Sequence, residues 1–177
     1  MNELEALALA LEVEKNELKF YLKLARKTTD ERARKMFLFL AKEEAEHWDL
    51  FEEKFVERLI EKCELPPVDK ELAQKLIVEE PETLSEVEAV KIGMEQEKLT
   101  WEFYEKAAKE AEHESVRRLF EELAKVEKGH YELLKAQYDS VMQTAYGWTT
   151  RTSALRWTDL SFNEHVNELY FFSQLPF

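Results

Sequence analysis

The sequence predicts an all-α protein in which four long helices form a bundle with one crossover connection. The 177 residues include only 3 glycines and 4 prolines, whereas charged residues make up 36% of the chain. Sheets and tight turns need more glycine and proline than this. Four long stretches of helical periodicity also alternate with two short loops and one long connector, over residues 65–83. This order of helices and connections is typical of a four-helix bundle with a single crossover.

The first two predicted helices span residues 3–26 and 31–64. Asp30 can cap the second helix, because its short carboxylate accepts hydrogen bonds from the first free backbone N–H groups. Pro66 and Pro67 are expected to end that helix, since proline has no backbone N–H and its ring clashes with the preceding turn.

The connector and the second pair of helices also carry local signals. Residues 70–78 form a short amphipathic segment within the connector. The third helix is expected to begin after Thr83 or Ser85 and to reach Ala111, and Ser85 and Glu88 have the spacing of a partial capping box. The fourth helix covers residues 114–144.

The two halves of the chain repeat each other at an offset of 83 residues. Aligned without a gap, residues 14–51 and 97–134 share 15 identities in 38 positions. Two unrelated helices rarely match in this way, because the alignment runs through a helix, a loop and a second helix. We interpret the chain as a duplicated helical hairpin with repeats at residues 5–64 and 84–144.

The composition changes after the bundle domain, which we assign to residues 1–145. Residues 146–177 hold 8 of the chain's 21 aromatic residues, and a capping-box pattern predicts a short helix over residues 162–172. Large apolar surfaces rarely stay exposed, which favours a lid or a subunit contact. The alternative is a segment that only covers the outside of the bundle, or a non-native tail.

Charge and cysteine content exclude several classes of function. The net charge is -13, whereas nucleic-acid binding needs a basic face. The single cysteine, Cys63, allows no internal disulfide and no site built on paired cysteines, and we expect it to be a small apolar filler. The first residues show no basic region and no long apolar run. We therefore expect neither a signal peptide nor a membrane span, and a cytoplasmic protein.

The residues that carry chemistry interrupt otherwise apolar stripes of the four helices. Read at alternating spacings of four and three residues, each stripe has a glutamate near its middle. The second and fourth stripes also have a histidine one turn later, at Glu-x-x-His spacing. The six residues are Glu14, Glu44, His47, Glu97, Glu127 and His130.

Four carboxylates in one core layer cannot all stay charged without compensation. Taking an ion out of water costs several kcal/mol, and close like charges add to that cost. Two divalent metal ions would balance the four carboxylates, and oxygen and imidazole ligands suit iron or manganese. The pattern therefore predicts a di-metal site in which carboxylates bridge the ions and each histidine binds one of them. The alternative is that these side chains are satisfied by other protein groups or face solvent.

At these residues the chain resembles the rubrerythrin-type branch of the ferritin-like superfamily. The resemblance covers residues 5–140 and depends on two Glu-x6-Tyr and two Glu-x-x-His motifs. These motifs are Glu14 to Tyr21, Glu44 to His47, Glu97 to Tyr104 and Glu127 to His130. The resemblance implies a ferritin-like bundle in which the four glutamates ligate or bridge two iron ions and the histidines are terminal ligands. Bacterioferritins and other di-iron oxidases share this ligand set, and manganese or a mixed pair of metals would also suit it.

Two features depart from the family pattern. Typical rubrerythrins carry a rubredoxin-like module with four cysteines, and one cysteine cannot supply it, so electrons would come from an external donor such as a rubredoxin. Rubrerythrins also have a further carboxylate three residues after the third-helix glutamate, where this chain has Thr100. Glu17, three residues after Glu14, is the candidate for an extra ligand. The alternative for Glu17 is a solvated surface residue.

The remaining tyrosines and histidines near the motifs are assigned supporting or surface positions. Tyr21 and Tyr104 lie two helical turns from their glutamates, and we expect them to donate hydrogen bonds to metal ligands of the opposite pair. Ordinary core tyrosines are the alternative. His113 and His165 are expected at the surface.

The function favoured by the sequence is a di-iron oxidoreductase that reduces hydrogen peroxide or dioxygen with electrons from ferrous iron. One alternative is a ferroxidase or iron-handling protein, for which iron is the substrate. Another is a non-enzymatic helical module in which the metals are a structural staple. We expect a homodimer, with exchange of hairpins between subunits as an open alternative, because the halves are alike and the connector is long.

Overall fold

Five helices make up the part of the chain that the computed structural model describes, residues 1–82 and 84–146. They are α1 (Glu3–Lys27), α2 (Glu31–Lys62), α3 (Lys70–Lys75), α4 (Glu86–Glu110) and α5 (Glu114–Tyr146). The prediction of an all-α bundle of four long helices is confirmed for the described residues. Nearly all of the predicted extension, including the expected helix over residues 162–172, lies outside the described residues.

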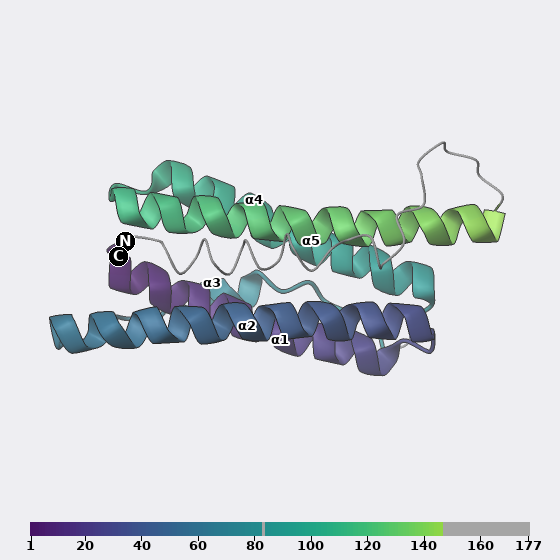
Figure 1. The fold of residues 1–177 in the computed structure, drawn as a ribbon, viewed down its shortest axis with the longest axis horizontal. Coiled ribbons are helices and arrows are strands. Elements are labelled where there is room, and N and C mark those ends of the chain that lie inside the picture. Colours follow the sequence, from purple (N-terminus) through teal and green to yellow (C-terminus); the bar gives the residue numbers. More distant parts are fainter. Residues whose placement is uncertain (83, 147–177) are drawn as a thin grey trace.

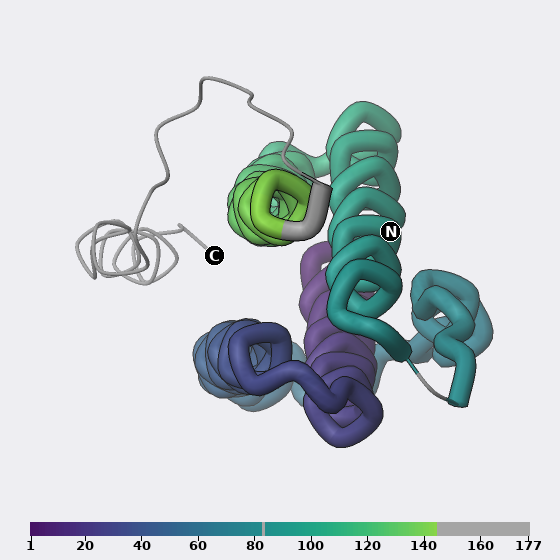
Figure 2. Tube along the Cα trace, turned by 90° about the vertical axis from the view of Figure 1, so that its right-hand side faces the viewer, coloured from purple at the N-terminus to yellow at the C-terminus, as the bar shows by residue number. Residues whose placement is uncertain are grey.

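The bundle consists of two antiparallel hairpins, α1 with α2 and α4 with α5 (Figure 1). α2 and α4 run in the same direction, so the connector between them returns the chain along the length of the bundle (Figure 1). Seen along the helices, α3 lies outside the four long helices and beside α1 (Figure 2). Thr28 and Leu84 form an isolated parallel bridge between the end of α1 and the start of α4. The connector is thus fixed at the surface of the bundle.

The starts of α2 and α4 are capped at the predicted residues, and α1 has a further cap that was not predicted. The Asp30 carboxylate accepts a hydrogen bond of 2.8 Å from the backbone N–H of Ala33. Ser85 and Glu88 form the complete capping box at the start of α4, and Asn2 and Glu5 form another at the start of α1. Each capping side chain satisfies backbone N–H groups that have no partner within the helix.

The end of α2 differs from the prediction. The helix ends at Lys62, before the two prolines, because Cys63 adopts a left-handed backbone conformation with a φ of 52°. No further helical turn covers Cys63, and its side chain is exposed. The expectation that Cys63 is a buried apolar filler is therefore wrong.

The apolar core is divided in two along the bundle. On α1, residues from Leu7 to Val13 belong to one buried cluster and residues from Phe20 to Leu24 belong to the other. Glu14 and Glu17 lie between these clusters in the chain and are themselves buried. A polar layer therefore crosses the bundle with apolar side chains on both sides of it. Among the described helices, none combines the length and apolar character needed to cross a membrane.

Candidate metal centre

The structure brings the six predicted ligands together in this polar layer. All four glutamates and His47 are fully buried, and His130 is 6% exposed. One group of neighbouring donor atoms comes from Glu14, Glu44 and His47, and another comes from Glu44, Glu97, Glu127 and His130. Within each group the donor atoms lie no more than 4.8 Å apart. Because Glu44 belongs to both groups, the layer contains two adjacent candidate metal positions with a common carboxylate.

The two histidines are arranged with the symmetry of the sequence repeat. His47 Nδ1 lies 3.4 Å from Glu14 and 3.5 Å from Glu44. His130 Nδ1 lies 3.5 Å from both Glu97 and Glu127, the corresponding residues of the second repeat. It also lies 3.2 Å from Glu44, which breaks the symmetry. The two imidazole rings stack with their centroids 5.8 Å apart.

Two tyrosine hydroxyls cross between the hairpins. Tyr21 on α1 donates a hydrogen bond to Glu97 on α4. Tyr104 on α4 donates one of 3.3 Å to Glu14 on α1. The expected hydrogen bonds to glutamates of the opposite pair are therefore present, and they fix the orientation of both carboxylates.

Glu17 also lies in the polar layer. Its side chain is fully buried, and one of its oxygens groups with those of Glu14, Glu44 and Glu127 within 4.8 Å. Its Oε1 accepts hydrogen bonds from Gln96 (2.9 Å) and Thr100 (3.0 Å). The alternative of a solvated surface residue is wrong, because the three-residue offset from Glu14 keeps Glu17 on the buried face of α1. Its role as an extra ligand stays a prediction.

Sequence reasoning missed two buried polar residues next to these ligands, Gln96 and Glu43. At the offset of the repeat, Gln96 corresponds to Val13 and Glu43 corresponds to Val126. Each is thus a polar residue at a position where the other repeat has valine. That difference between the repeats was the available signal.

Burial and neighbouring carboxylates raise the pKa of several glutamates. Burial raises the pKa of Glu14 from 4.5 to about 7. Burial, with nearby carboxylates, raises the pKa of Glu17 and Glu127 well above the usual range. Burial acts in the same direction on Glu44, but the two histidines outweigh it and lower the pKa of Glu44. Without metal, the layer therefore keeps some carboxyl groups protonated.

For the two histidines, burial and the neighbouring carboxylates change the pKa in opposite directions. Burial alone would lower the pKa of His47, but the Glu14 and Glu44 carboxylates outweigh it and raise the pKa to about 10. The pKa of His130 is also raised, because Glu44 and Glu97 outweigh its burial. Protons on the imidazoles thus compensate part of the negative charge that metal ions would otherwise balance.

The donor atoms of the layer fit a pair of metal ions. Within the described part of the chain, seven of its buried carboxylate oxygens accept no hydrogen bond. They are Glu14 Oε2, Glu17 Oε2, Glu97 Oε2 and both oxygens of Glu44 and of Glu127. Five of these seven oxygens lie 3.2–3.5 Å from a histidine Nδ1. Buried acceptors without a hydrogen bond are costly, and cations would satisfy them. Oxygen and imidazole donors without a thiolate suit iron or manganese.

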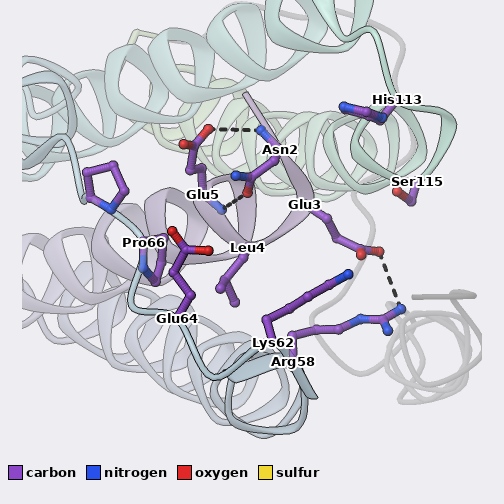
Figure 3. Close-up of a pocket in the computed structure, with 11 residues that line it drawn as sticks. Asn2, Glu3, Leu4, Glu5, Arg58, Lys62, Glu64, Pro66, His113 and Ser115 are labelled. Carbon is purple, nitrogen blue, oxygen red and sulfur yellow. Dashed lines mark hydrogen bonds and ion pairs between the residues drawn. The ribbon is translucent and has the colours of Figure 1, made fainter. Parts of the chain in front are cut away.

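A surface pocket of about 390 Å³ lies at the end of the bundle, and none of the predicted ligands lines it (Figure 3). Its polar side chains already serve the fold, since Asn2 and Glu5 cap α1 and Arg58 lies 3.5 Å from Glu3. His113, also at this pocket, is exposed as expected. We therefore place the candidate site in the buried layer.

A duplicated four-helix bundle with a buried layer of carboxylates and histidines is the arrangement of ferritin-like di-metal proteins. The family model for rubrerythrin matches residues 5–138, and the chain belongs to the rubrerythrin family. The chain is also similar to a solved structure, a hypothetical protein from Pyrococcus furiosus, with 25% identity and a TM-score of 0.56. That similarity covers 81% of this chain and 92% of the other. No curated protein matches the chain.

Proposed function

We propose that the protein is a di-iron oxidoreductase that reduces hydrogen peroxide or dioxygen and receives electrons from an external donor, such as a rubredoxin. The observation that carries this proposal is the set of buried carboxylate oxygens without hydrogen-bond partners, flanked by two histidines. The site would hold two ferrous ions, which would supply the two electrons needed to reduce the oxidant.

The six predicted ligands would hold the ions in two adjacent positions. Glu14 and His47 belong to the first position, and Glu97, Glu127 and His130 belong to the second. Glu44 belongs to both, and Glu127 also lies in a group with Glu14 and Glu17, so both carboxylates would suit a bridging role. Tyr21 and Tyr104 hold Glu97 and Glu14 in orientation through their hydroxyls.

The surroundings of the layer favour iron as a resident cofactor over iron as a substrate. The four glutamates and His47 have no exposed surface, and the two apolar clusters enclose the layer along the bundle. An ion that is released in each cycle needs a route to solvent, which such enclosure disfavours. Exclusion of water also strengthens the attraction between the carboxylates and the ions.

Anaerobic loading with ferrous iron followed by stopped-flow mixing tests the proposal. One sample is mixed with hydrogen peroxide and a parallel one with dioxygen, and iron absorbance is followed. We expect two ions per chain, oxidation by at least one oxidant, and retention of iron through repeated cycles of chemical re-reduction.

Two results would contradict this function. Iron that leaves the protein after each oxidation would identify an iron-handling protein. Two stably bound ions that neither oxidant oxidises would identify a structural metal site.

A further inference from the structure

Gln96 on α4 connects the polar layer to the crossover connector. Its side chain is fully buried. Its Nε2 donates hydrogen bonds to Glu17 Oε1 (2.9 Å) and to the backbone carbonyl of Leu76 (2.8 Å). Its Oε1 accepts a hydrogen bond of 2.9 Å from the backbone N–H of Val78. One amide therefore joins α1, α4 and the segment that follows α3.

The two backbone partners determine which way this amide points. A backbone N–H can only donate, so the Gln96 atom that faces Val78 is the oxygen. A backbone carbonyl can only accept, so the atom that faces Leu76 is the nitrogen. The second N–H of that nitrogen is then directed at Glu17. The hydrogen bond to Glu17 is thus imposed by the connector.

Because of this hydrogen bond, the two oxygens of Glu17 have different surroundings. Oε1 accepts from Gln96 and from Thr100, whereas the buried Oε2 accepts no hydrogen bond. A carboxylate with one oxygen bound to two donors has only its other oxygen left for a cation.

The arrangement exists on one side of the layer only. At the offset of the repeat, Glu17 corresponds to Thr100 and Gln96 corresponds to Val13. The first repeat therefore supplies the carboxylate and the second supplies both of its donors. No equivalent pair can form with the roles exchanged, because Thr100 carries no carboxylate and Val13 carries no hydrogen-bond donor.

We propose that Gln96 is a positioning residue that holds Glu17 as a single-oxygen ligand of the metal centre and couples that ligand to the connector at Leu76 and Val78. The inference deepens the proposed function and depends on the same di-metal site. It differs from a mobile carboxylate that moves toward the metals and away from them, because the two donors keep Glu17 in place. It also implies that metal binding at Glu17 stabilises the connector.

A double-mutant cycle on metal affinity tests the proposal. Mn²⁺ is titrated into metal-free wild type, Gln96→Leu, Glu17→Gln and the double variant. Loss of a hydrogen bond that supports a ligand typically weakens metal binding by about 10–100-fold, which is the expected effect of Gln96→Leu. In the Glu17→Gln background the same substitution is expected to change affinity by less than about 2-fold, since residues that act through one contact are not additive.

Hydrogen exchange at the Val78 amide supplies a readout that is independent of activity. In wild type, saturation with Mn²⁺ is expected to slow this exchange, and in Glu17→Gln it is expected to leave the exchange unchanged. Thr100→Val is the matched control, because it removes the other donor to Glu17 and leaves the contacts to Leu76 and Val78 intact. Its metal-free exchange at Val78 is expected to equal that of wild type. Gln96→Asn, which keeps the amide but shortens its reach, replaces Gln96→Leu if the latter does not fold.

The outcomes separate this inference from the proposed function. Wild type that binds no Mn²⁺ and no Fe²⁺ would overturn both. Wild type that binds metal while Gln96→Leu binds it equally well would overturn the role of Gln96 alone. If Gln96→Leu lowers metal affinity equally in wild type and in Glu17→Gln, the role of Gln96 is also overturned, since Gln96 would then act through the stability of the fold.

Discussion

At the residue scale, the carboxylates of the polar layer differ because their neighbours differ. Glu44 lies near both histidines, which lower its pKa despite its burial. The pKa of Glu127 is raised, because burial and the neighbouring carboxylates outweigh the effect of His130 beside it. Glu46, two residues after Glu44 and therefore on another face of α2, pairs instead with Lys42 and is one-third exposed. Glu44 is thus a buried candidate ligand, whereas Glu46 on the same helix forms a surface ion pair.

Removal of one ligand tests this difference. Loss of a hydrogen bond that supports a ligand weakens metal binding by about 10–100-fold. We expect Glu127→Ala to have a larger effect, because it removes a direct ligand. Glu46→Ala is the control and should retain the wild-type metal content. Metal-to-protein ratios after equilibrium dialysis provide the measurement, and equal ratios for Glu127→Ala and wild type would contradict the ligand assignment.

At the scale of the elements, two neighbouring helices come close to α4 at a glycine. A Cβ on Gly93 of α4 would lie 3.2 Å from Leu134 on α5 and 3.4 Å from Phe37 on α2. Gly129 on α5, between Lys128 and His130, has no atom within 4 Å of such a Cβ. The two glycines of the long helices therefore differ in what a side chain would meet.

Substitutions at these two glycines should change stability in opposite directions. Gly129→Ala is expected to stabilise the protein by about 0.5–1 kcal/mol, since alanine loses less backbone entropy in a helix. Gly93→Leu is expected to destabilise it by about 1–3 kcal/mol, because it overpacks the contact between α4 and α5. Urea unfolding of the metal-free protein measures both. A Gly93→Leu variant as stable as wild type would show that the helices can separate at no cost.

At the scale of the whole molecule, the polar layer makes stability depend on pH. The pKa of Glu14 is about 7 in the folded protein against 4.5 ordinarily, and those of Glu17 and Glu127 are also raised. The folded metal-free state therefore binds more protons than the unfolded chain between these values. The stabilisation that these protons give the folded state is complete below the pKa that the glutamates have in the unfolded chain. It is lost as pH rises through their pKa in the folded protein. Glu44 opposes it only below its ordinary pKa, where protonation removes its ion pairs.

We therefore expect the metal-free protein to become more stable as pH falls from 7 to 5. Glu14 alone would contribute about 2 kcal/mol over that range. The metal-loaded protein should show the reverse trend, since protons then compete with metal for the ligands. Thermal melts of both forms across this range supply the measurement, and a metal-free protein without the gain would contradict a clustered site.

The assembly of the molecule is also a prediction at this scale. We expect a homodimer, because the halves are alike and the connector between α2 and α4 is long enough to carry a hairpin to another subunit. Light scattering at micromolar concentration should give about twice the mass of the 21.1 kDa chain. A monomer would contradict this expectation, and a large cage would favour the iron-handling alternative.

The sequence by itself determined the fold class, the helix starts and the six candidate ligands. These features depend on local periodicity, on capping residues such as Asp30 and Ser85, and on a repeat that runs through two helices. Such signals lie within one helix or one hairpin, so they can be read without knowledge of how the hairpins meet. The end of α2 was misjudged because Cys63, not the more obvious prolines, terminates the helix.

Only the tertiary structure decided the surroundings of those ligands. The contact of Glu17 with its two donors on α4 depends on how the two hairpins face each other, which no local pattern encodes. The link from Gln96 to Leu76 and Val78 likewise depends on where the connector crosses the bundle. Two distant segments can form a hydrogen bond only where packing places them side by side. The asymmetry of the centre, with Glu17 and its donors on one side only, therefore becomes visible only in the folded structure.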